Sequence, residues 1–405
     1  TVERSQSLPF LNRPLLLDML IIILLTCCSA FTVNPPSVRV NTMKLPMIGL
    51  SEVSSMSQSE AETLASPFFG GSLFPYLGFL YYLKQPQCET PRGVWVGFAS
   101  LLSFVILTIP AAVAAKLLFD AGLADVDWLH GSAESLLTIT NLVTVLSFRQ
   151  AFRNNTTFTV DLNNNNEGNF VAVNLVVALT LLALIPTCIL PGILHTPAIH
   201  DSYLNGFLDL PFKFSSEPSN ALSISTWLIH VSSLIEFLVV MGFCFEWAKV
   251  TGNERWKGLA VALVPLHSSG LVACTYHLFY NSNYVLLPLQ AALTFFGNCC
   301  VMAGAWRIAN GAIVAKEGEE AREFLTSTKA AKVDGFEDLG IVFSDDNDAL
   351  FLSKVFLICL TLSYGIKYGS ILGVPYLANN ENVALPLAVI LLPTLFNLKK
   401  WTARD

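Results

Sequence analysis

Six polar side chains interrupt three long apolar segments in the second half of the chain. An ionisable group inside such a segment costs roughly 2.5–3.5 kcal/mol on membrane-insertion scales, so each one implies a partner or a function. Because a helix rises 1.5 Å per residue, counting residues from the segment ends gives the depth of each side chain. The count predicts two polar layers, a middle layer of Glu236, His267 and Asn298 and an outer layer of His230, His277 and Gln290.

A related pair of polar residues lies in the first half of the chain. The stretch DWLHGSAE places His130 and Glu134 four residues apart. This spacing puts both side chains on one face of a helix. Depth follows from the sequence for all of these residues, but the direction in which each side chain points does not.

Three interpretations of the polar layers remain open. They could be interhelical hydrogen bonds that fix helix register. They could bind a tetrapyrrole, with His230, His277 and possibly His130 as axial ligands to haem or chlorophyll. They could form a proton relay or catalytic site that uses Glu236 with His267. The cysteines show no metal-ligand spacing, so we expect no metal site, and no catalytic residue is established.

The composition predicts an integral membrane protein. The chain of 405 residues is 53% hydrophobic and only 13% charged, which is about half the charged fraction of an average soluble domain. The net charge of −7 argues against a nucleic-acid partner, which would require clustered Lys and Arg. Membrane lipid is therefore the first partner that we expect.

The apolar runs predict an all-α, polytopic fold with about nine transmembrane helices, or eight as the alternative. Two of the nine are shorter than the roughly 17–25 residues over which helices span a membrane. The seven stronger runs are 94–115, 132–148, 170–190, 222–247, 258–280, 285–306 and 351–373, and the two weaker ones are 68–83 and 384–398.

Loop charge predicts the orientation of these spans. The Lys and Arg residues outside them fall mostly on one side, which would be the stroma of a plastid, together with the C-terminus. The segment 307–350 lies on that side and is acidic. It is either a solvated spacer or a docking surface for photosynthetic membrane complexes. The Gly365, Gly369 and Gly373 spacing predicts close approach of another helix.

The N-terminus has the pattern of a targeting sequence. Residues 1–30 include a short apolar run ending in small residues, which predicts a signal peptide, and 31–65 read as a transit-like segment. The junction before Phe31 resembles the presequences of algae with secondary plastids. An ordinary secretory signal is the alternative. We expect a plastid membrane, either thylakoid or inner envelope.

Two long stretches resemble known families. Residues 221–307, with WLIHVSSLIE and CTYHLFYN, resemble the hypothetical chloroplast reading frame forty-nine family. Residues 67–153, with LADVDWLHGSAESLLTITNL, resemble a second membrane domain of unknown function from cyanobacteria and plastids. The resemblance implies a membrane protein of an oxygenic phototroph and brings no activity or catalytic residues with it.

These observations predict a domain order and a function. The domains after the presequence are an N-terminal membrane domain, a three-helix membrane module, an acidic stromal segment and C-terminal membrane helices, over 66–215, 216–308, 309–350 and 351–405. The expected function is a non-enzymatic, photosynthesis-related factor that supports assembly or holds a pigment or haem. The alternative is a transporter or integral-membrane enzyme with a Glu/His pair.

Overall fold

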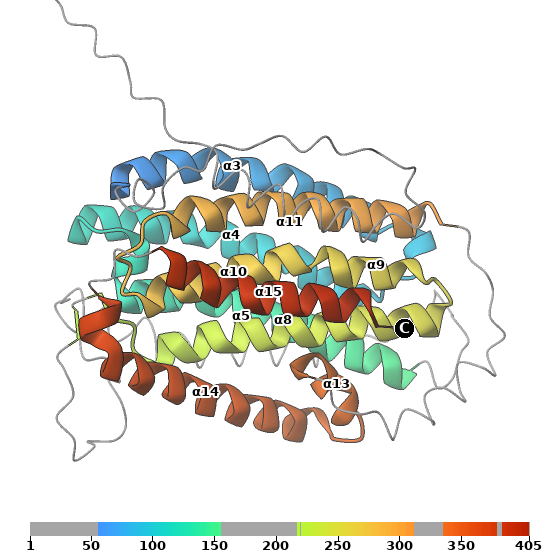
Figure 1. The fold of residues 1–405 in the computed structure, drawn as a ribbon. Helices are drawn as coiled ribbons and strands as arrows, with labels where there is room; N and C mark the ends of the chain where they lie inside the picture. The colour runs from blue at the N-terminus through green and yellow to red at the C-terminus, as the bar shows by residue number, and fades with distance from the viewer. Residues whose placement is uncertain (1–55, 155–216, 219, 312–334, 379–382, 405) are drawn as a thin grey trace, which may run out of the picture.

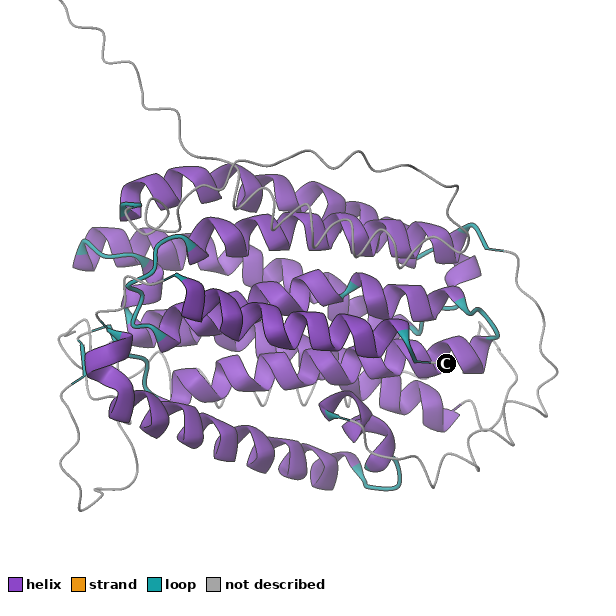
Figure 2. Ribbon diagram, in the orientation of Figure 1, coloured by secondary structure: helices purple, strands orange, loops and turns teal. Residues whose placement is uncertain are grey.

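The computed structural model describes residues 56–154, 217–218, 220–311, 335–378 and 383–404. This part of the chain consists of helices and connecting loops (Figure 2). The long helices are α3 (Gln58–Leu83), α4 (Arg92–Phe119), α5 (Asp127–Asn154), α8 (Ile224–Thr251), α9 (Arg255–Ala262), α10 (Val264–Leu278), α11 (Leu286–Ala309), α14 (Asp348–Leu377) and α15 (Ala384–Thr402). The short ones are η1 (Pro86–Cys88), η2 (Leu123–Asp125), η5 (Phe336–Asp338) and α13 (Leu339–Val342).

The all-α membrane class predicted from the sequence is confirmed. Six crossings in the described residues are long and apolar enough to span a membrane: α4, α8, α9 with α10, α11, α14 and α15. The segments 68–83 and 132–148 are also helical, as α3 and α5, but they are not among those six. The predicted span 170–190 lies outside the described residues, as do the signal peptide and most of the transit-like segment. The count of nine is therefore not confirmed.

The helices lie side by side along a common direction (Figure 1). Helix α8 is the central element, because it packs against α5, α9, α10 and α14. Helix α4 covers α5, α3 covers α11, and α15 lies on α10. Helices α9 and α10 form one crossing that breaks at Leu263, where Pro265 follows near the start of α10. Proline lacks the N–H that would continue the preceding turn, which explains a break at this position.

Side-chain caps fix the starts of three helices. Ser57 and Glu60 form a reciprocal capping box at the start of α3. The side chains of Ser223 and Asn347 accept hydrogen bonds from backbone N–H groups in the first turns of α8 and α14. Each cap satisfies a donor that the helix leaves unpaired.

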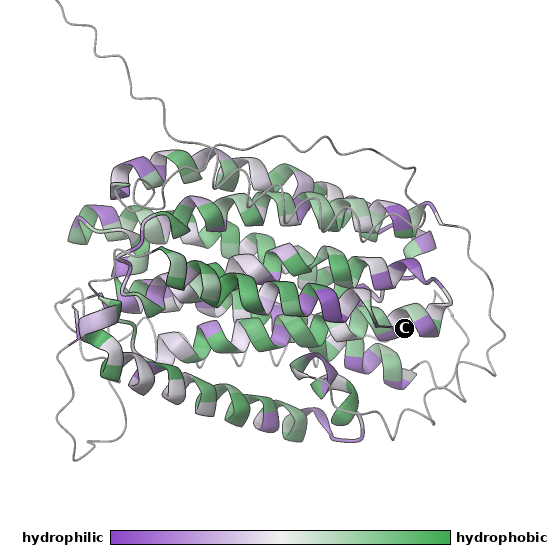
Figure 3. Ribbon diagram, in the orientation of Figure 1, coloured by the Kyte–Doolittle hydropathy of each residue, from purple (hydrophilic) through white to green (hydrophobic). Residues whose placement is uncertain are grey.

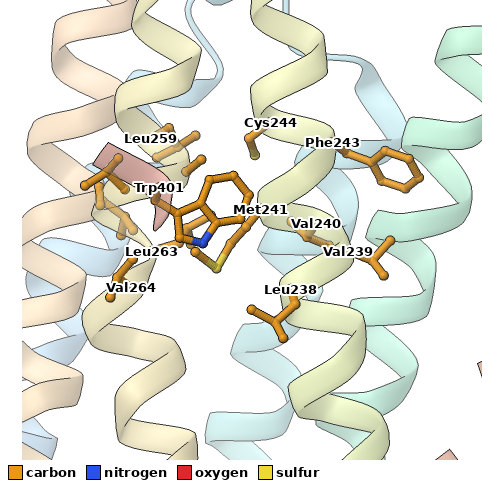
Figure 4. Close-up of a cluster of buried hydrophobic side chains, with 14 of the residues drawn as sticks. Leu238, Val239, Val240, Met241, Phe243, Cys244, Leu259, Leu263, Val264 and Trp401 are labelled. Carbon is orange, nitrogen blue, oxygen red and sulfur yellow. The ribbon is translucent and has the colours of Figure 1, made fainter. Parts of the chain in front are cut away.

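The apolar core is centred on α8. Met241 and Cys244 of α8 are fully buried, and Trp401 of α15 lies beside Leu263 and Val264 (Figure 4). By contrast, the outer faces of α4, α14 and α15 present exposed large apolar side chains, and the ribbon is hydrophobic along most of its length (Figure 3). Such faces are stable in lipid, so the structure agrees with a membrane location.

The small-residue spacing in α14 does not produce the predicted close helix contact within the described residues. A Cβ added at Gly365 or Gly369 would meet no atom within 4 Å. A Cβ at Gly373 would meet only Leu377 of the same helix. Among the described residues this prediction is not confirmed, because spacing alone does not say which face of a helix is covered.

The part of the acidic segment that the structure describes is packed into the fold rather than being a solvated spacer. Glu337 and Asp338 are buried and pair with Lys400 and Arg404 at the end of α15. The Glu337 carbonyl lies so close to α8 that a Cβ at Gly242 would collide with it. Helix α14 begins at Asp348, slightly before the predicted boundary at 351. Residues 312–334 of the segment lie outside the described residues.

Arg149 near the end of α5 fastens this segment to the bundle. Its guanidinium donates to the Asp348 carboxylate at 3.1 Å and to the carbonyls of Phe343 and Asp346 at 3.0 and 2.8 Å. The guanidinium carbon also lies 4.0 Å from the centre of the Phe351 ring. The Arg149 side chain is 3% exposed, so its removal leaves buried carbonyls without donors.

We expect Arg149→Ala to lower the free energy of unfolding by about 2 kcal/mol, the size of a lost charge-assisted hydrogen bond to buried acceptors. Thermal unfolding in detergent measures this change. Arg153→Ala is the matched control, because that arginine also contacts Asp348 but its side chain is 46% exposed. Equal losses in the two variants would contradict the buried role of Arg149.

Candidate functional site

Three of the six histidines in the chain converge at one end of the bundle. Nε2 of His130 lies 3.0 Å from Nε2 of His230 and 3.1 Å from Nε2 of His277. One possible ligand atom from each ring lies within 4.8 Å of the others. The side chains are 5–7% exposed. We call these residues the three-histidine centre.

Each histidine comes from a different helix, close to the end of that helix. His130 lies in the first turn of α5, His230 in the second turn of α8, and His277 in the last turn of α10. Asp127 ties two of these ends together, since its Oδ1 accepts a hydrogen bond from the backbone N–H of Ser223 at 2.9 Å. The starts of α5 and α8 are therefore held in one register.

A glycine brings α5 and α8 close enough for their histidines to meet. A Cβ at Gly131 would lie 2.6 Å from Oγ1 of Thr226. Real Cβ atoms almost never approach another atom so closely, so a side chain here would push the helices apart. Further along the same two helices, Oγ1 of Thr138 lies 2.8 Å from Oγ of Ser233 and forms a second contact between α5 and α8.

A network of amides covers the centre at its loop side. The Asn281 side chain donates to Oδ1 of Asp125 at 2.7 Å and to the Ala124 carbonyl at 3.1 Å. Asn220 donates to the same Asp125 oxygen at 3.3 Å and to the Tyr280 carbonyl at 2.9 Å. The network joins the loops before α5, before α8 and after α10, which are the loops beside the three histidines.

The outer layer predicted from depth is only partly assembled. The rings of His230 and His277 stack with their centres 5.0 Å apart. Gln290 is half-buried and contributes its backbone carbonyl, which accepts from Ser269 at 3.1 Å. Glu134, one turn after His130, lies near Cys274 of α10. His130 completes the cluster instead of Gln290.

The middle layer does not form a joint site. Glu236 lies near the Cys359 thiol of α14, and its Oε2 is buried without a hydrogen-bond partner. His267 faces the ring of Phe237, with the ring centres 6.2 Å apart. No hydrogen bond joins Glu236 to His267 in the described part of the chain. The predicted Glu/His pair is therefore not assembled.

The third member of that layer also points elsewhere. Nδ2 of Asn298 donates to the Ser72 carbonyl of α3 at 3.0 Å. Its role is to join α11 to α3 in a part of the bundle away from Glu236. A shared depth was the only basis for grouping the three residues.

Neither the position of Asn281 nor the possibility of a metal site was predicted from the sequence. Asn281 lies in the turn just beyond the end of α10, with a left-handed backbone, so helical spacing from His277 gives no signal for it. Metal ligation was excluded from cysteine spacing alone. Three imidazole nitrogens that converge from three helices are nevertheless a donor set suited to a metal ion.

Two parts of the chain match families of known proteins. A family of unknown function, DUF3593, matches residues 65–153, and a second such family, DUF2499, matches residues 221–307. A Ycf49-like protein of Synechocystis sp. is 42% identical over 91 residues, which cover 22% of this chain and 88% of that protein. The chain belongs to the Ycf49-like family. The resemblance predicted from the sequence is confirmed.

A second Ycf49 relative supports this assignment. The uncharacterized protein ycf49 of Cyanophora paradoxa is 37% identical over 81 residues, which cover 20% of this chain and 79% of that protein. No solved structure matches the chain. The Ycf49 relatives point to a plastid or cyanobacterial membrane.

The two matched domains share the three-histidine centre. His130 lies in the DUF3593 match, and His230 and His277 lie in the DUF2499 match. The centre therefore requires both domains, which this Ycf49-family chain carries in one polypeptide.

Proposed function

We propose that the chain is a non-enzymatic, cofactor-holding protein of a photosynthetic membrane, in a plastid or its cyanobacterial equivalent, with its cofactor at the three-histidine centre. One observation carries this proposal, namely the convergence of three buried imidazole nitrogens from three helices at 3.0 and 3.1 Å. Interhelical hydrogen bonding alone is a weak reason for such a cluster. Polar contacts between membrane helices contribute only about 0.6 kcal/mol on average.

The protein purified from its native membranes tests this proposal. We expect it to contain one cofactor per chain, detected either as a Soret band in the absorption spectrum or as bound metal by elemental analysis. We expect His230→Ala to lose that cofactor. His267→Ala is the matched control, because His267 is equally buried in the same bundle but lies outside the centre. A wild-type protein with neither pigment nor metal would contradict the proposal.

A transporter or membrane enzyme centred on Glu236 is the second candidate. The buried, unpartnered Oε2 of Glu236 favours it, because a carboxyl group in the apolar interior requires a reason. The lack of a contact with His267 weighs against it.

We expect Glu236→Gln to accumulate normally and to restore growth to a strain that lacks the gene, because the amide keeps the shape and polarity of a neutral carboxyl group. Protein level and growth under light measure this outcome. A variant that accumulates but fails to restore growth would favour the transporter or enzyme instead.

A further inference from the structure

We infer that the three-histidine centre holds one first-row transition metal ion of the zinc, copper or iron type through the Nε2 atoms of His130, His230 and His277. This inference rests on the proposed function and names the class of its cofactor. The ligands come from two domains, so the ion would also join the DUF3593 and DUF2499 parts of the chain.

The distances between the imidazole nitrogens suit a shared ion. Metal–nitrogen bonds to histidine are roughly 2.0–2.1 Å long, so two nitrogens bound to one ion at angles of about 90–110° lie roughly 2.9–3.4 Å apart. The two distances from His130 are 3.0 and 3.1 Å. The His230 and His277 ligand atoms lie within 4.8 Å of each other, and a small rotation of their rings brings them into the same range.

Hydrogen bonding alone leaves the cluster incompletely satisfied. An imidazole nitrogen offers either one N–H or one lone pair, so Nε2 of His130 can make one well-directed hydrogen bond although two nitrogens lie within reach. Nδ1 of His130 and Nδ1 of His277 are also buried without a hydrogen-bond partner. A cation at the common point would accept all three Nε2 lone pairs together.

Asn281 is placed to support His277 as a ligand. Metal-bound histidines usually donate their other ring N–H to an oxygen, which fixes the tautomer. The Asn281 amide lies beside the His277 ring, and its Oδ1 is buried without a partner, like Nδ1 of His277. A slight adjustment lets Nδ1–H donate to that oxygen. The Asn281 amide nitrogen is already held by Asp125, which restricts the orientation of the amide group.

The ligand type and the packing of the three rings favour a transition metal ion over magnesium, calcium or a tetrapyrrole. Imidazole ligands suit zinc, copper, iron and nickel, whereas magnesium and calcium prefer oxygen ligands. A haem or chlorophyll ring would have to lie between its axial histidine and the opposite face of its pocket. The three rings here contact one another, with centres 4.8–5.0 Å apart, which leaves no room for a macrocycle between them.

Cobalt binding to the purified full-length protein tests this inference. The protein carries an affinity tag without histidines and is stripped with a chelator before Co²⁺ is added. We expect visible d–d absorption that saturates at one Co²⁺ per chain and weakens on acidification, because protons compete for the ligands. We expect His130→Gln, His230→Gln and His277→Gln each to bind at least 100-fold more weakly, and Asn281→Ala about 10- to 100-fold more weakly.

His267→Gln is the control variant, and we expect it to bind Co²⁺ as the wild type does. A wild-type protein without the d–d band, or His230→Gln that binds as tightly as His267→Gln, would overturn the inference. These measurements also distinguish a failure of the proposed function from a failure of the metal assignment. A protein that binds Co²⁺ in this way but contains no cofactor in native membranes would contradict only the proposed function, whereas a native preparation with a histidine-dependent Soret band would overturn the metal assignment.

Discussion

Replacing His130, His230 and His277 together by leucine is expected to abolish cofactor binding while leaving the free energy of unfolding of the cofactor-free protein unchanged or higher. His130 contacts both other histidines, so replacing all three leaves no buried imidazole of the centre without its partner. Leucine fills a similar volume without polar atoms. Replacing buried polar groups by apolar groups of the same shape is often neutral or stabilising. Metal analysis and thermal unfolding of the stripped protein measure the two effects.

This variant separates a functional centre from a structural one. If the imidazoles served only to hold the helices in register, the triple leucine variant would destabilise the stripped protein by about 0.6–1.7 kcal/mol, the range found for polar contacts between membrane helices. Destabilisation of this size, together with wild-type metal content, would refute a cofactor role. His267→Leu provides the comparison for losing a buried imidazole elsewhere in the bundle.

Gly131→Val is expected to separate α5 from α8 and to destroy the centre. The first added carbon would already lie 2.6 Å from Oγ1 of Thr226, and the two methyl groups require further space. Overpacking of this kind typically costs 1–3 kcal/mol. We therefore expect low accumulation in the membrane and no retained cofactor, measured by immunoblot and by metal analysis of whatever folded protein is recovered.

Two further variants make this prediction specific. Gly365→Val is the matched control, since a Cβ there meets no atom within 4 Å, and we expect normal accumulation. The double variant Gly131→Ala with Thr226→Ala removes the oxygen that the new Cβ would meet, so we expect partial recovery of the cofactor. Normal cofactor content in Gly131→Val would show that close approach of α5 and α8 is not required.

The sequence predicts depth in this fold much better than direction. Counting residues placed His230 and His277 at one level, and the structure brings their rings to 5.0 Å. It placed Glu236, His267 and Asn298 at another level, but these side chains face α14, Phe237 and α3. Helices that are apolar on all sides give no periodic signal of which face is covered, so rotation about the helix axis was not predictable.

The partners of the centre were hidden for a similar reason. His130 lies 100 residues before His230 in the chain, and only packing of α5 on α8 brings them together. That packing depends on Gly131 and Thr226, whose contact no spacing rule shows. The charge pattern indicated an acidic segment correctly, but burial of Glu337 and Asp338 depends on Lys400 and Arg404 at the far end of the chain.

X-ray absorption spectroscopy of the protein purified from native membranes tests the central claim most directly. We expect one metal edge of the zinc, copper or iron type, with a first shell that includes three imidazole nitrogens at roughly 2.0–2.1 Å. We also expect His230→Ala to remove the edge. A wild-type protein with no metal edge, or one whose metal has the four-nitrogen shell of a porphyrin, would contradict a metal ion at the three-histidine centre.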